Sequence, residues 1–441
     1  MEIQVSKLRE ALKLLDPVVP KKAMVKSIGY VYLGNGRAMA TDLEIAVKVD
    51  LPEASEKMLI PVMAALDFLE TIPGHRMVTV TVKGKNVVLT SGSMEAEYTT
   101  EDPEDFPPIE RGDFEHDAVL NGEALVKALV TVWDCSAKED TRVVLHGVCL
   151  TTGDDIAAVG ADGFQLAVEK IQGKLPGDKP LIIPREAVRF IERLWSKAAA
   201  PDLTGVETPA QLAMAKRPIR LEYNSDALQL HFGRVTMLIK LTQGTFPNYS
   251  QLIPSSFTSS VTVWAEDFKR VLKAVGKLAK HSSGITRLEW SEEKLKVSAR
   301  AEEYGSSSGS IGAKCTSPGK IAFNITYLEN WLAPLQGEVT ISMSKADAPG
   351  LFSHRNSIRV IMPMYVAWDG DGGAKTEATA EPVEPTDEAG DVPGDVPNDT
   401  PTDEVGETTN EPGIDEGTEN EPVPGTSKPK RTRKPKVPVL N

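Results

Sequence analysis

Apolar residues recur at positions i, i+3, i+4 and i+7 in three segments of the chain, which is the spacing of an amphipathic helix. These segments begin near Ser6, Asn121 and Ala265. Each is followed by segments in which apolar and polar residues alternate, as they do in half-buried strands. The predicted buried faces of the three helices are Leu8, Ala11, Leu12 and Leu15, then Leu125, Ala128, Leu129 and Val132, then Phe268, Val271, Leu272, Val275 and Leu278.

A second helix is predicted after each set of strands, at residues 61–70, 184–197 and 325–335. Two of these begin with proline, Pro61 and Pro184, which we expect in the first helical turn, where a missing N–H costs nothing. Further alternating segments follow each second helix. Asn35-Gly36 lies between two strand segments and predicts a tight hairpin turn.

The order helix, strands, helix, strands thus occurs three times. It predicts an α+β protein of three tandem homologous domains, at residues 1–116, 117–255 and 256–368, each with two helices packed on antiparallel sheet. Units of this length are too long for solenoid repeats. The first two close alike, with EDFPPIE at 104–110 and GTFPNYSQLIP at 244–254, and the second holds an extra loop near 198–217.

Residues 369–441 differ from the rest in composition. They contain no aromatic residue, 18 acidic residues and 7 basic residues, so most of the net charge of -14 lies here. A segment rich in Pro, Glu, Asp, Thr and Gly cannot bury enough apolar surface to offset its ordering entropy. We therefore expect a disordered acidic tail with a basic end at Lys428–Lys436.

Composition also limits the compartment. Mean hydropathy is -0.21, no apolar run is long enough to span a bilayer, and the N-terminal segment lacks the apolar region of a signal peptide. Cys135, Cys149 and Cys315 are too widely spaced for a disulfide framework or a zinc site. We expect a cytoplasmic protein with no membrane partner, no metal and no cofactor.

Enzyme signatures are weak. Gly305-Ser-Ser-Ser-Gly309 matches G-x-S-x-G, but it is predicted in a Ser-rich loop between strands, whereas a nucleophile elbow joins a strand to a helix. The chain has no Walker A loop, and its six histidines lack metal-ligand spacing. We predict a non-enzymatic protein, and a hydrolase using Ser307 is the alternative.

Basic residues four apart form stripes on two predicted helices. Like charges on one helix face repel one another unless an anion compensates. Phosphates held in this way give binding that is independent of base sequence and sensitive to salt. A solvated helix face is the alternative interpretation. The candidate contacts to double-stranded DNA are Arg185, Arg189, Arg193 and Lys197, then Lys269, Lys273 and Lys277, with Lys7, Arg9 and Lys13 on the first helix.

Four short motifs occur in order along residues 1–368: Ala40-Thr-Asp-Leu-Glu-Ile45, Ala161-Asp-Gly-Phe-Gln-Leu166, Thr245-Phe-Pro-Asn-Tyr249 and Val360-Ile-Met-Pro-Met364. Together with the three repeats they resemble the bacterial sliding clamp family, the beta subunit of DNA polymerase III. The resemblance implies a head-to-tail homodimer whose six domains encircle double-stranded DNA and make a replicative DNA polymerase processive. It also implies a clamp loader as partner, and a DNA contact at Lys22 in the loop after the first helix.

The resemblance further implies that partners dock by a short peptide in an apolar pocket between the second and third domains. The matching positions are Leu145, Asp162, Gly163, Leu166, Pro247, Leu252, Val360, Met362, Pro363 and Met364. This chain has Phe164-Gln165 where the family usually has His-Arg, and Tyr365 where Arg is frequent. We therefore expect a pocket that is more aromatic and less cationic.

Other interpretations remain open. The pocket residues could simply pack one domain against the next. The whole chain could be a three-domain protein-interaction scaffold that does not encircle DNA. A trimeric clamp has two domains per chain, and the third repeat argues against it.

Overall fold

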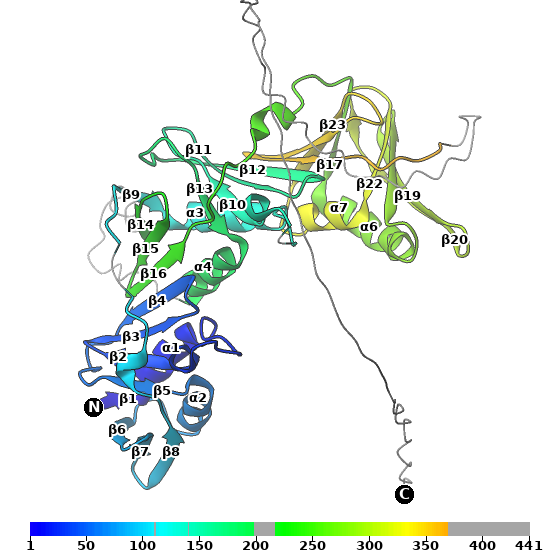
Figure 1. Ribbon diagram of the computed structural model, residues 1–441. Helices are drawn as coiled ribbons and strands as arrows, with labels where there is room; N and C mark the ends of the chain where they lie inside the picture. Colours follow the sequence, from blue (N-terminus) through cyan, green and yellow to red (C-terminus); the bar gives the residue numbers. More distant parts are fainter. Residues whose placement is uncertain (110–111, 140, 198–216, 369–441) are drawn as a thin grey trace, which may run out of the picture. The chain divides into compact units, whose positions relative to one another are not determined.

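The computed structural model describes residues 1–109, 112–139, 141–197 and 217–368 (Figure 1). Within these ranges helices pack on antiparallel sheets, which confirms the α+β class. Nearly all of the extra loop expected near 198–217, and the whole of the expected tail at 369–441, lie outside the described residues. The domain limits stay a prediction.

The first helix of each repeat lies where the apolar periodicity predicts it. These helices are α1 (Val5–Leu15), α3 (Gly122–Trp133) and α6 (Ala265–Lys280). All predicted core residues of α1 and α3 are buried. In α6, Val271 and Leu278 are only partly buried, and Ala279 completes the buried face instead.

The second helix of each repeat is α2 (Val62–Glu70), α4 (Arg185–Lys197) or α7 (Ile325–Leu332). The expectation of proline in the first turn is wrong by one residue. Pro61 is the N-cap of α2, and Pro184 is the last residue of the strand before α4. The helix α7 ends three residues earlier than expected, with Ala333 as its C-cap.

The strands form four sheets. In spatial order, one four-stranded sheet contains β1 (Glu2–Gln4), β6 (Met77–Lys83), β7 (Asn86–Ser91) and β8 (Met94–Thr99). In the same order, the eight-stranded sheet contains β5 (Met58–Ile60), β2 (Val31–Gly34), β3 (Arg37–Thr41), β4 (Ile45–Asp50), β16 (Val235–Lys240), β15 (Ala227–Phe232), β14 (Pro218–Tyr223) and β9 (His116–Asn121).

The nine-stranded sheet contains, again from edge to edge, β13 (Leu181–Pro184), β10 (Gly147–Leu150), β11 (Ile156–Ala161), β12 (Gln165–Ile171), β25 (Ser357–Ile361), β24 (Gly350–His354), β23 (Glu338–Met343), β17 (Ser259–Trp264) and β21 (Lys314–Cys315). The second four-stranded sheet contains β20 (Gly305–Gly312), β19 (Lys294–Ala301), β18 (Ile285–Ser291) and β22 (Gly319–Asn324).

Two local expectations have clear outcomes. Asn35 and Gly36 have φ of 55° and 73° between β2 and β3, as the tight hairpin requires, so this prediction is confirmed. The Ser-rich segment expected as a loop is instead the strand β20, whose residues pair with β19. Ser307 therefore does not lie on a strand-to-helix turn.

Successive repeats are linked by an antiparallel pair of strands, and each such pair forms a joint. The strand β4 of the first repeat pairs antiparallel with β16, which is the last strand of the second repeat. By the same rule β12 of the second repeat pairs with β25, the last strand of the third. In the third repeat β20 corresponds to β4 and β12, and in the first repeat β8 corresponds to β16 and β25. Neither is part of a joint, and each lies at the edge of its four-stranded sheet.

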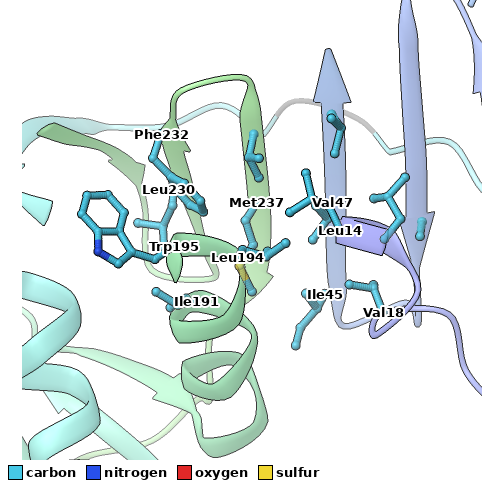
Figure 2. Close-up of a cluster of buried hydrophobic side chains, with 14 of the residues drawn as sticks. Leu14, Val18, Ile45, Val47, Ile191, Leu194, Trp195, Leu230, Phe232 and Met237 are labelled. Atoms are coloured by element: carbon cyan, nitrogen blue, oxygen red, sulfur yellow. The ribbon is translucent and has the colours of Figure 1, made fainter. Parts of the chain in front are cut away.

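The hydrophobic core is continuous across the first joint. Leu14 of α1 and Val47 of β4 lie in one cluster with Leu194 of α4 and Met237 of β16 (Figure 2). The third repeat has its own core, with Phe268, Phe323 and Phe352 among its largest buried side chains. Burial of these apolar side chains is the main force that stabilises the helices and the joint against the sheets.

All three cysteines, Cys135, Cys149 and Cys315, are free. Burial raises the pKa of Cys149 to about 12 and that of Cys135 still further. Among the described residues no helix is long and apolar enough to cross a membrane, and no group of three or more His, Cys, Asp or Glu could hold a metal ion.

Candidate nucleic-acid and partner-binding sites

The joint between β12 and β25 carries an apolar cluster on the face of the sheet opposite α3. Leu166 is the register partner of Val360, and both are buried there with Leu145. Phe246 covers the same cluster, with Tyr249 and Ile253 packed against it. Residues expected in one pocket, from three distant segments, are thus brought to one place.

The same segments also present apolar side chains to solvent. Phe164 is 55% exposed, Leu252 57%, Met362 44% and Tyr365 82%. Pro247 is exposed as well, whereas Pro363 and Met364 are half-buried. Exposed apolar groups contiguous with a buried cluster are typical of a surface that binds another molecule.

A hydrogen-bonded turn shapes one side of this surface. The Asp162 carboxylate accepts from the backbone N–H of Phe164 and of Gln165, both at 2.8 Å. Gly163 has φ of +93°, a conformation that favours glycine. The backbone N–H of Met362 donates to the Phe164 carbonyl at 2.8 Å, which fixes the two sides of the surface against each other.

The Met-Pro-Met segment follows directly on β25. The strand β25 ends at Ile361, and it lies inside the nine-stranded sheet rather than at its edge. Residues Met362 to Met364 have left the ladder, as a proline favours. The Met364 N–H still donates to the Ala322 carbonyl at 2.7 Å, so the segment is fixed.

An arginine that the sequence motifs do not include lies beside this surface. A Cβ placed on Gly163 would lie 2.6 Å from a guanidinium nitrogen of Arg142, so this exposed arginine lies over the turn. Arg142 precedes Leu145 by three residues, and the short helix η3 (Val143–Leu145) connects them. The repeated motifs give no signal for it.

The basic stripe on α4 is shorter than expected. Arg185 is buried, and its guanidinium donates to the carbonyls of Trp133 and Ser136 at 2.7 and 2.8 Å. It ties α4 to the end of α3, so its assignment to an exposed DNA-binding face is wrong. Arg189, Arg193 and Lys197 are exposed; Arg189 also stacks on Trp133 and pairs with Glu192.

On α6, too, one basic residue of the predicted stripe binds backbone carbonyls of the protein. The Lys269 ammonium donates to the carbonyls of Ala333 and Leu335 at 3.0 and 2.6 Å, just after α7. A cation there satisfies carbonyls that the helix end leaves without partners, so the expectation of a free Lys269 is wrong. Lys273 and Lys277 are exposed, and within the described ranges neither forms an ion pair.

Basic residues of α1 and α4 meet at one cavity of about 350 Å³. Arg9, Lys13 and Lys197 line it, and the Lys197 ammonium donates to the Lys13 carbonyl at 3.3 Å. Lys13 also pairs with Glu70 at 2.7 Å, and Lys7 pairs with Glu53 at 2.6 Å. Lys22 is exposed in the loop after α1. The cavity can accept an anionic oxygen.

Three tandem repeats are thus joined strand to strand and carry basic helices. The family model for the DNA polymerase III beta subunit, C-terminal domain, matches residues 250–365. The beta sliding clamp of Vibrio cholerae is 25% identical over 337 residues, covering 74% of this chain and 87% of the relative. That of Pseudomonas aeruginosa is 22% identical over 378 residues, covering 82% and 98%.

Solved structures agree in fold. The crystal structure of the DNA polymerase sliding clamp from Pseudomonas aeruginosa with ligand has a TM-score of 0.73 at 22% identity, covering 83% of this chain and 99% of that one. The DNA polymerase III beta subunit of Thermotoga maritima gives 0.73 at 19% identity, with the same coverage. In sequence and in fold the chain is thus similar to the bacterial DNA polymerase III beta subunits, the beta sliding clamps.

Proposed function

We propose that this protein is a DNA sliding clamp. Two chains close head to tail into a ring that encircles double-stranded DNA without reading its sequence. The ring holds a replicative DNA polymerase on its template, and a clamp loader opens and closes it. The clamp is a non-enzymatic scaffold of the bacterial or phage-infected cytoplasm.

The repeated joint is the observation that carries this proposal. The first repeat joins the second through β4 and β16, and the second joins the third through β12 and β25. The same rule applied once more pairs β20 of one chain with β8 of another. Head-to-tail contacts of this kind form a ring when the rotation closes and a filament when it does not. Two chains supply six repeats.

Partners of the ring are proposed to dock at the surface formed by Leu166, Val360, Phe164, Met362 and Met364. Its buried cluster and exposed rim suit a short peptide with apolar anchors. We propose that the polymerase and the clamp loader each carry such a peptide. The two would therefore compete for this surface. The Gly305–Gly309 strand offers no nucleophile elbow, so we expect no hydrolase activity.

Retention on circular DNA tests the proposal. Protein loaded on a nicked plasmid should stay bound during gel filtration at high salt, and cutting the plasmid once should release it. A scaffold that does not encircle DNA would be retained equally on circular and on linear plasmid DNA. Native mass spectrometry should show two chains per particle at micromolar concentration.

Charge reversal of Arg189, Arg193, Lys273 and Lys277 should weaken contact with DNA while leaving the fold intact, because all four are exposed. Each lost phosphate contact lowers the slope of log K against log salt by about 0.9. We therefore expect a clearly flatter salt dependence and faster release from linear duplex, measured by fluorescence anisotropy with two unrelated sequences.

The matched control is Lys83→Glu with Lys85→Glu, on the exposed β6–β7 hairpin away from the basic helices. It should bind DNA as the wild type does. Equal salt slopes for the helix variant and this control would show that α4 and α6 do not face DNA. A strong preference for one sequence would contradict encirclement itself.

A further inference from the structure

Arg359 lies on β25 at the joint, on the face opposite the apolar cluster. It is 4% exposed, and its guanidinium forms a bidentate pair with the Asp134 carboxylate, at 3.0 and 2.8 Å. A third hydrogen bond reaches the Thr131 carbonyl at 3.2 Å. Asp134 is the C-cap of α3, so the pair connects the third repeat to the second.

The connection continues to the turn that shapes the partner-binding surface. The Gln165 side-chain amide donates to the Asp134 carbonyl at 3.3 Å and to the Asp162 carboxylate at 3.0 Å. Asp162 in turn holds the N–H groups of Phe164 and Gln165. On α7, burial and then the charge of Asp162 raise the pKa of Tyr327 to about 12.

The other joint shows that the fold does not need this ion pair. The register places Leu238 opposite Ala46 where Val360 lies opposite Leu166, so Met237 occupies the position of Arg359. Met237 is fully buried in the core. The helix C-cap at that joint is also an aspartate, Asp16, and among the described residues no arginine forms an ion pair with it.

A buried ion pair is often no more stabilising than apolar side chains of similar size, because both charges must lose water. The best-attested benefit of such a pair is a fixed register. At the β12–β25 joint a one-residue slip of β25 would turn Val360 away from the apolar cluster. Asp134 and Arg359 oppose this slip, because only the observed register aligns both carboxylate oxygens with the guanidinium.

We propose that Asp134 and Arg359 are positioning residues for partner docking. Their pair fixes the third repeat against the second, and through Gln165 and Asp162 it sets the separation of Phe164 from Met362. The β4–β16 joint, with methionine at this place, has no such constraint. This inference rests on the proposed docking surface.

The test uses the full-length chain and one labelled probe. The probe is a fluorescein-labelled heptapeptide selected on the wild-type protein from a random phage-displayed library, kept only if Met362→Ala with Met364→Ala abolishes its binding. The main variant is Asp134→Asn with Arg359→Met. It places methionine where the β4–β16 joint has Met237, and it removes both charges so that neither is buried without its partner. Met237→Leu at the other joint is the matched control.

The double variant should keep the thermal midpoint and the circular-DNA retention of the wild type but bind the probe at least about tenfold more weakly, a loss of about 1.4 kcal/mol. Arg359→Lys should restore part of the affinity, since it keeps a cation for Asp134. The Met237→Leu control should bind the probe normally.

Unchanged probe affinity in a folded double variant would overturn the positioning role. If the double variant does not fold, the pair of Arg359→Lys and Asp134→Glu decides instead: wild-type affinity in both, despite altered reach, would equally overturn it. Failure to select any probe dependent on Met362 and Met364 would be a different result, because it would reject the docking surface itself.

Discussion

Replacing Ser308 and Ser310 with glutamate is expected to open the ring. Both are exposed positions on β20, the strand that the joint rule pairs with β8 of another chain. On β8 the exposed residues Glu95 and Glu97 would lie on the same face of the combined sheet. Like charges across adjacent strands destabilise by about 0.2–1 kcal/mol for each pair.

One ring contains two such joints, so the total loss is roughly 1–4 kcal/mol, and we expect the dissociation constant to rise about fivefold or more. Analytical ultracentrifugation measures the shift from two chains to one. Loss of closure should also abolish retention on circular DNA. No effect is expected on helix content, because these serines do not contribute to the core.

Charge exchange provides the control. Adding Glu95→Lys and Glu97→Lys to the same chain should restore the dimer, since every repulsive pair becomes attractive. Ser55→Glu with Ser291→Glu adds two charges at exposed positions outside β8 and β20 and should leave the dimer unchanged. A dimer that tolerates the β20 variant, or is not restored by the exchange, would place the subunit contact elsewhere.

The sequence predicts elements well where one periodicity dominates. The buried faces of α1 and α3 follow from apolar spacing alone, because a helix with one apolar stripe has only one way to bury it. The Asn35-Gly36 turn follows from local backbone preference. Neither requires knowledge of the rest of the chain.

The charged residues are where the sequence misleads. In the sequence, Arg185, Arg189 and Lys273 look alike, because each belongs to a stripe of basic residues spaced four apart. Only the tertiary fold shows that the carbonyls of Trp133 and Ser136 lie within reach of Arg185. A periodic pattern identifies a polar face, but it does not reveal which polar groups another element brings to that face.

The partner surface divides in the same way. The motifs predict Leu166 and Val360 together although they lie far apart in the chain, and the β12–β25 register confirms that they are paired. The sequence does not reveal Arg142 or the Asp134–Arg359 pair. The first is found only through the close approach of its side chain to Gly163, and the second joins residues that no shared motif connects.

Replacing Met362 and Met364 with alanine is expected to abolish binding of an apolar partner peptide without opening the ring. The proposed ring contact uses β8 and β20, whereas these methionines follow β25. Methionine adapts its shape to irregular apolar partners, and Met362 already exposes 44% of its surface. The backbone bonds of both residues do not depend on the side chains.

Loss of a buried methionine side chain costs about 2–5 kcal/mol in a core, and less in an open groove. Binding through a few such anchors should therefore weaken at least about tenfold. Phe164 and Tyr365 should also favour peptides with an aromatic residue, through edge-to-face contacts. Fluorescence anisotropy with paired aromatic and aliphatic peptides measures both effects.

Met24→Ala with Met63→Ala is the matched control, because both methionines are exposed and lie far along the chain from β25. That variant should bind peptides as the wild type does, and native mass should show two chains for both variants. Equal peptide affinity in the Met362/Met364 variant would mean that the Met-Pro-Met segment only completes the packing of the third repeat, and that partners dock on another surface of the protein.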